Sequence, residues 1–88
     1  MIGYRRADGV AVVEDGSVVY AAILPGGPIV VLEGVAGVIW TEACRGPGST
    51  IAERVAAATE ASVADIHEHV ASFVEMLVQR GLLTPGER

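Results

Sequence analysis

Residues 24–40, LPGGPIVVLEGVAGVIW, contain the change from a strand pattern to a helix pattern that decides the fold. Residues 25–28, PGGP, predict a chain reversal, because proline and glycine favour turns and interrupt regular structure. The apolar run Ile29–Leu32 that follows is typical of a short β-strand. Over residues 34–44 the apolar residues recur at helical spacing, which predicts a helix that packs Trp40 and its apolar neighbours into the core.

The chain before this stretch has the pattern of two further strands. Residues 10–14 are rich in valine, and residues 17–24 resume the β-branched and aromatic composition of strands. Between them, Asp15-Gly16 favours a tight hairpin, because glycine readily adopts a positive φ. Short connections join antiparallel neighbours, so residues 10–32 predict a three-stranded antiparallel sheet.

The chain after this stretch predicts two more helices. Thr50 and Glu53 match a capping box, which marks the start of a helix over residues 50–59. Gly81 is placed to end a third helix, which is expected over residues 62–80. The predicted fold is therefore α+β: a three-stranded antiparallel sheet followed by three helices, in a winged helix-turn-helix-like arrangement.

The predicted helix over residues 62–80 has a wider apolar arc than one packing contact requires. One sector is expected to form the core face and contains Ile66, Val70, Phe73 and Leu77. The neighbouring sector is nearly free of charge and contains Val63, His67, Ala71, Val74 and Val78. We therefore expect this second sector to contact something other than the core of the domain.

The composition indicates a single folded domain over residues 1–88. Hydrophobic residues make up 51% of the chain, which excludes a disordered protein and leaves apolar surface for a partner. The net charge is −5 and the basic residues are all arginine. This charge argues against a nucleic-acid partner, because nucleic-acid-binding domains usually carry a basic face.

The expected location follows from three features of the sequence. Cys44 is the only cysteine, so the chain forms no internal disulfide, as in proteins of a reducing compartment. Its first residues lack the pattern of a signal peptide. The longest apolar stretch, residues 18–32, is interrupted by prolines and glycines and is too short to span a bilayer. We therefore expect a cytoplasmic protein without a membrane span.

Three stretches of the sequence together resemble the PqqD-like family. They are residues 24–40, the start signal Thr50-Ile51-Ala52-Glu53, and the closing segment from Asp65-Ile66 through Phe73-Val74-Glu75-Met76-Leu77 to Arg80-Gly81-Leu82-Leu83. The resemblance extends over nearly the whole chain. It implies a RiPP recognition element, a winged helix-turn-helix domain that serves ribosomally made and post-translationally modified peptides.

The resemblance implies a binding function without catalysis. Such domains take up the leader of a precursor peptide as an added strand, between the third strand and the third helix. They then present it to a modifying enzyme such as a radical SAM protein, a peptidase or a cyclase. Carried onto this sequence, the pairing strand is Ile29, Val30, Val31 and Leu32. The facing helix surface is the second sector (Val63, His67, Ala71, Val74 and Val78). No catalytic residue, metal ligand or cofactor is expected.

Two other functions are compatible with the same elements. A free strand edge also allows a homodimeric structural adaptor, and the helical arrangement is shared with DNA-binding winged-helix proteins. Acidic residues outnumber basic ones along residues 50–80, which makes DNA binding the weakest of the three hypotheses. His67 and His69 lie two residues apart and diverge on a helix, so they do not predict a metal site.

Overall fold

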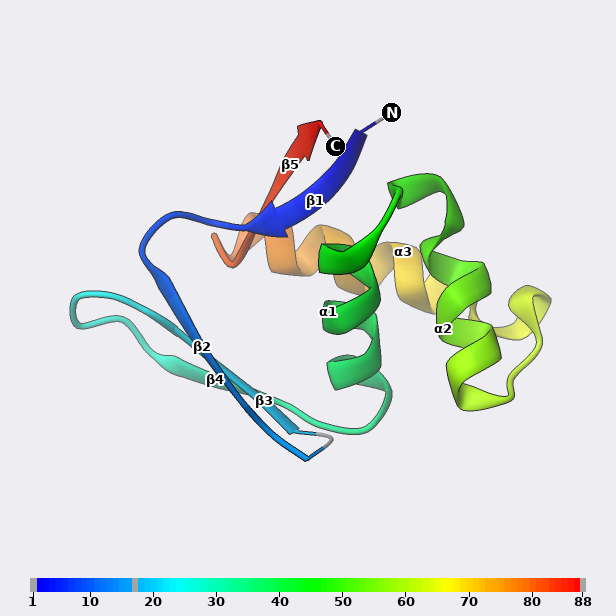
Figure 1. Ribbon diagram of the computed structural model, residues 1–88, viewed down its shortest axis with the longest axis horizontal. Helices are drawn as coiled ribbons and strands as arrows, with labels where there is room; N and C mark the ends of the chain where they lie inside the picture. The colour runs from blue at the N-terminus through cyan, green and yellow to red at the C-terminus, as the bar shows by residue number, and fades with distance from the viewer. Residues whose placement is uncertain (1, 17, 88) are drawn as a thin grey trace.

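The protein is described by a computed structural model that covers residues 2–16 and 18–87 (Figure 1). Its elements are, in chain order, β1 (Ile2–Arg6), β2 (Val10–Asp15), β3 (Val18–Ile23), β4 (Ile29–Leu32), α1 (Val35–Arg45), the 3-10 helix η1 (Gly48–Thr50), α2 (Ile51–Thr59), α3 (Val63–Gln79) and β5 (Leu83–Glu87). The strands and helices predicted between residues 10 and 80 are all present. Residue 17, the predicted first residue of the second strand, lies outside the described residues.

The predicted three-stranded antiparallel sheet is confirmed, with the strand order β2-β3-β4. Tyr20 in the middle strand pairs with Val13 on one side and with Val31 on the other. The β3–β4 connection contains the expected reversal, in which Gly26 has a φ of 78° that most other residues would avoid.

The three predicted helices lie on one side of this sheet, in a winged-helix-like arrangement (Figure 1). In Figure 1, α1 lies between the sheet and α2, and α3 crosses behind α1. α1 packs against β3, β4, α2 and α3, so it is the element that joins the sheet to the rest of the helices. The predicted packing of Trp40 is confirmed, since its side chain is 3% exposed.

A second, two-stranded sheet was not predicted from the sequence. β1 and β5 pair antiparallel, and Tyr4 lies opposite Pro85. Neither strand has a clear pattern, because β1 reads IGYRR and β5 reads LTPGE, with glycine, proline and charged residues in both. Their pairing joins opposite ends of the described chain, and a local sequence pattern carries no information on such distant contacts.

The core extends from the inner face of the sheet into the space between the three helices and β5. The most deeply buried large side chains are Ile39, Val55, Leu77, Leu82 and Leu83. In α3, three of the four predicted core residues are buried and Phe73 is half-buried. Val74 is also buried, at 5% exposed, although it was placed in the second sector. The core face of α3 is therefore rotated toward the second sector.

The two predicted helix-end signals have different outcomes. Gly81 ends α3 as expected, with a φ of 79° and a hydrogen bond from the Leu82 amide back to the Leu77 carbonyl at 3.0 Å. The capping box at Thr50 is wrong, because the Thr50 side chain makes no cap hydrogen bond to the start of α2. Its hydroxyl instead donates to the Pro47 carbonyl and accepts from the Arg54 guanidinium.

Arg54 in α2 forms hydrogen bonds with Glu42, near the end of α1, and with Pro47, just after it. Its Nη1 donates to the backbone oxygen of Glu42 at 2.8 Å and to the Glu42 carboxylate at 3.1 Å, and its Nη2 donates to Pro47 at 2.7 Å. Arg54→Lys should lower the free energy of unfolding by about 1–3 kcal/mol, because an ammonium cannot reproduce this planar fork. Urea denaturation measures the change. Arg45→Lys is the control, since the Arg45 side chain is 70% exposed and should change stability little.

Candidate functional site

β4 forms one edge of the three-stranded sheet. It pairs with β3 on one side, and no other strand among residues 2–16 and 18–87 pairs with its other side. An edge strand of this kind presents backbone donors and acceptors that an extended peptide can satisfy. The predicted unsatisfied β-edge is therefore present in the part of the chain that the structure describes.

Hydrogen bonds at the end of β3 show which way its backbone groups point. The amide of Leu24, directly after β3, donates to the Gly9 carbonyl on the β2 side at 2.8 Å. The Gly27 amide donates to the Ile23 carbonyl at 2.8 Å, within the turn that leads to β4. Neighbouring residues of a strand point their backbone groups in opposite directions. The odd-numbered residues of β3 therefore face β4.

This assignment identifies the backbone groups on the free edge of β4. Ala21 faces β4 and pairs with Val30, so Val30 and, two residues later, Leu32 bond to β3. The N–H and C=O groups of Ile29 and Val31 consequently point away from the sheet. These two residues offer two donors and two acceptors in one row.

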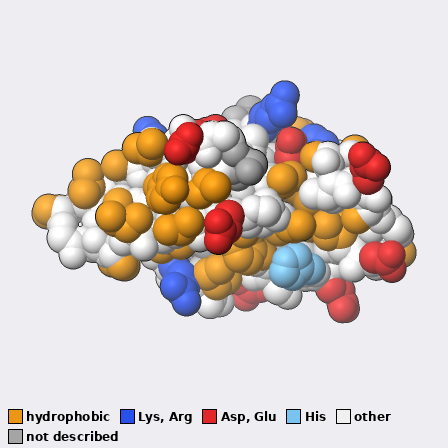
Figure 2. All heavy atoms as spheres, turned by 90° about the horizontal axis from the view of Figure 1, so that it is seen from below, with side chains coloured by type: hydrophobic (Ala, Val, Ile, Leu, Met, Phe, Trp, Pro, Cys, Tyr) orange, Lys and Arg blue, Asp and Glu red, His pale blue; other side chains and the backbone are white. Residues whose placement is uncertain are grey.

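The side chains of the same two residues lie on the outer face of the sheet, away from the helices. Ile29 is 69% exposed and Val31 is 51% exposed, whereas Leu32 is buried on the inner face. The outer face continues across the sheet through Tyr20 and Val13, which are also exposed. Figure 2 shows hydrophobic side chains spread over the sheet end of the molecule.

The opposite edge of the sheet, β2, is less suited to accept a peptide. β2 ends in Glu14 and Asp15, and charged side chains on an edge strand discourage further pairing. The Val10 amide is already used, since it donates to the Ala7 carbonyl at 3.2 Å. β4 contains no charged residue. The composition of the two edges thus favours β4.

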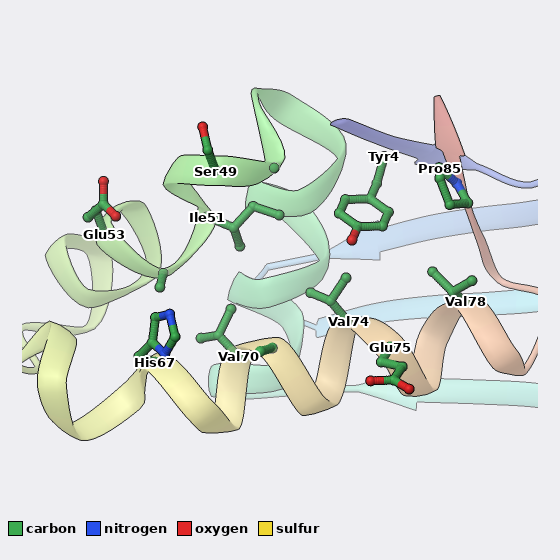
Figure 3. A pocket seen from close by; sticks show the side chains of 13 residues that line it. Tyr4, Ser49, Ile51, Glu53, His67, Val70, Val74, Glu75, Val78 and Pro85 are labelled. Atoms are coloured by element: carbon green, nitrogen blue, oxygen red, sulfur yellow. The ribbon is translucent and has the colours of Figure 1, made fainter. Parts of the chain in front are cut away.

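Most of the predicted helix surface lines a pocket to which β4 does not contribute. Four of the five residues of this surface, His67, Ala71, Val74 and Val78, line a pocket of about 380 Å³ together with Tyr4, Ile51 and Pro85. Figure 3 shows His67, Val74 and Val78 on the side of α3 that faces Ile51, Tyr4 and Pro85. None of Ile29, Val30, Val31 and Leu32 lines this pocket. The fifth predicted residue, Val63, is exposed at the start of α3 and does not line it either.

The other flank of α3 carries a second pair of apolar residues. At about 100° per residue, Phe73 and Met76 lie on the side of the core face opposite to Ala71 and Val78. Both are half-buried and pack against the core. The periodicity of the sequence could not decide which flank of α3 faces the sheet. It shows which positions of a helix are apolar, but not which other elements pack against them.

Several residues that line the pocket were not predicted as site residues, among them Tyr4, Ile51 and Pro85. Ile51 was only part of a helix start signal, and the other two belong to the unpredicted sheet of β1 and β5. The pairing of Tyr4 with Pro85 brings both side chains over α3 (Figure 3). No local sequence pattern indicates that Tyr4 and Pro85 lie beside α3.

Residues 2–16 and 18–87 contain no group of three or more metal-ligating side chains. In the same part of the chain no helix is long and apolar enough to cross a membrane. The two features described at the surface are the strand edge of β4 and the pocket beside α3.

The fold and the site define a small winged-helix-like domain with one open strand edge and a separate apolar pocket. The chain belongs to the PqqD family, described as coenzyme PQQ synthesis protein D, whose family model matches residues 12–83. Members of this family are non-catalytic accessory proteins that bind peptides in the biosynthesis of PQQ and other products of ribosomally made peptides. No curated protein and no solved structure matches the chain significantly.

Proposed function

We propose that this protein binds the leader segment of a ribosomally synthesised precursor peptide as an added strand on β4 and presents it to a modifying enzyme. The observation that carries the proposal is the row of free backbone groups at Ile29 and Val31. The family supports the choice of a peptide as ligand. The apolar, uncharged composition of β4 supports the choice of this edge.

The energetics of strand addition fit a binding equilibrium that can be reversed. Each new backbone hydrogen bond contributes about 0.5–1.5 kcal/mol net, so up to four of them supply a few kcal/mol. Burial of two or three leader side chains at about 25 cal/mol per Å² adds the remainder, less the cost of ordering the peptide. A dissociation constant in the micromolar range, or about −8 kcal/mol, follows.

The helical wall of this binding site is proposed on the flank of α3 that carries Phe73 and Met76. α1 packs against both β4 and α3, so a strand added to β4 extends the sheet over α1 toward α3. Side chains that alternate along the leader would then point toward this wall and away from it. Phe73 and Met76 supply apolar surface there, in place of the residues that line the pocket.

Hydrogen exchange tests where the leader binds. With a leader peptide encoded beside the gene, the amides of Ile29 and Val31 should become protected at least tenfold, because they acquire carbonyl partners. The amides of Val30 and Leu32 already donate within the sheet and should change little. NMR exchange rates with and without the peptide provide the measurement. Protection that is confined to α2 or α3 would show that the leader does not pair with β4.

The homodimeric adaptor makes a different prediction for the same edge. If two copies pair through β4, the amides of Ile29 and Val31 are protected without any peptide, and protection increases with protein concentration. Light scattering over the same concentrations would report twice the monomer mass. A monomer with fast-exchanging edge amides excludes this alternative and leaves the edge free for the leader.

A further inference from the structure

The pocket beside α3 has an apolar floor and an acidic rim. Ile51, Val70 and Val74 are buried and form much of the floor. Glu53 and Glu75 also line the pocket and are exposed. Figure 3 shows the two glutamates on opposite sides of the opening. The volume of about 380 Å³ is within the range of about 300–1,000 Å³ that is typical of ligand sites.

The charge at this rim is not neutralised within the described part of the chain. The salt bridges found there involve Glu42 and not the two rim carboxylates. The Glu75 carboxylate accepts a hydrogen bond from the side-chain amide of Gln79 at 3.3 Å, and this bond does not neutralise the negative charge of Glu75. The described residues that line the pocket include no lysine or arginine. The surface is therefore complementary to an apolar group that has a cation on each side.

One wall of the pocket lies outside the region that the family model matches. That region ends at residue 83 and begins at residue 12, so it contains neither Tyr4 nor Pro85. These two residues are brought to the pocket by the β1–β5 sheet. The pocket is thus completed by parts of this chain that the family pattern does not require.

We propose that this pocket is a docking site for a basic segment of the modifying enzyme, which inserts one apolar side chain between Glu53 and Glu75. The inserted side chain supplies most of the affinity through burial, and the two carboxylates orient the segment and speed its association. The choice of the enzyme as the partner rests on the proposed function. The chemistry of the pocket does not depend on it. The enzyme is favoured over the leader because Ile29 and Val31, the proposed leader site, do not line the pocket.

Model peptides test the chemistry without the enzyme. The probe is an 11-residue peptide of glycine and serine that carries one leucine with an arginine on each side. One control peptide has glutamates in place of the arginines, and another has serine in place of the leucine. In NMR titrations the first peptide should shift the amides of Ile51, Ala52 and Ala71, and the controls should not. Equal shifts with the acidic peptide, or shifts that avoid these residues, would overturn the proposal.

Surface variants test the two carboxylates with little risk to the fold. The variant with both Glu53→Gln and Glu75→Gln should bind the arginine–leucine peptide about tenfold more weakly at low salt. This corresponds to about threefold for each exposed carboxylate. The matched control is Glu60→Gln with Glu68→Gln, which removes the same charge outside the pocket. Ala71→Lys places a cation at the rim and should block the peptide, while Ser72→Lys on the neighbouring position should not. Equal effects of variant and control would contradict a local site.

The leader peptide provides the test that separates this proposal from the proposed function. Disruption of the β4 edge should prevent leader binding and leave the affinity for the arginine–leucine peptide unchanged. The variant with Glu53→Gln and Glu75→Gln should weaken binding of the arginine–leucine peptide and leave leader binding unchanged. If the leader itself shifts Ile51 and Ala71 and displaces the model peptide, the pocket is a leader site and docking of the enzyme there is excluded.

Discussion

Val31→Pro is expected to weaken leader binding about 10- to 100-fold while the protein remains folded. The substitution removes the N–H group of Val31, which points to the free edge, and the proline ring obstructs the approach of a strand. The loss of one or two hydrogen bonds and of neighbouring contacts corresponds to about 1.5–3 kcal/mol. Isothermal titration calorimetry with the leader peptide measures the change, and circular dichroism reports whether the fold is retained.

The matched control is proline at the preceding residue. The Val30 amide donates to β3, so Val30→Pro should break the sheet and lower the free energy of unfolding by about 3 kcal/mol or more. The contrast between two adjacent substitutions tests the direction of the backbone groups. Stronger unfolding by Val31→Pro than by Val30→Pro would mean that the assignment is inverted. Unchanged leader affinity in a folded Val31→Pro protein would mean that the leader binds elsewhere.

Val74→Asp is expected to unfold the protein rather than to remove a contact with a peptide. Val74 is 5% exposed and belongs to the core, so the substitution both removes apolar burial and places a carboxyl group among apolar side chains. We expect a loss of about 3–5 kcal/mol, which is a large part of the stability of a domain of this size. Urea denaturation followed by circular dichroism measures the loss.

Ala71→Asp is the control for this prediction, because Ala71 lies on the same helix but is exposed. It should change the free energy of unfolding by less than about 1 kcal/mol. A Val74→Asp protein as stable as Ala71→Asp would place Val74 at the surface. It would then restore Val74 to the predicted binding face of α3.

The three-stranded sheet and the three helices could be predicted because their signals are local. Residues 25–28 stop one strand and reverse the chain, and Gly81 ends α3 with a positive φ. Each signal acts within a few residues, where backbone preferences determine the structure. The pairing of β1 with β5 depends on residues about eighty positions apart in the chain, such as Tyr4 and Pro85, so no local preference indicates it.

The strand Ile29–Leu32 could be predicted, whereas the position of the second apolar sector of α3 could not. Ile29–Leu32 is apolar and follows a turn, which is sufficient to predict a strand with side chains that need cover on both faces. For α3, periodicity defined an apolar arc and left open which part of it is buried. The arrangement of α1, α2 and β5 around α3 decides this point. Val74 is buried there, and His67, Ala71 and Val78 line the pocket together with Ile51, Tyr4 and Pro85.

The β1–β5 sheet has a consequence for any protein fused to this domain. Its two strands are antiparallel partners, so both ends of the described chain emerge side by side, at the top of Figure 1, whereas the β2–β3–β4 sheet lies at the lower left. A tether at either end would hold its cargo near the pocket at a high effective concentration. Such a fusion should leave β4 accessible, whereas a tag inserted in the β3–β4 loop would stand beside the open edge.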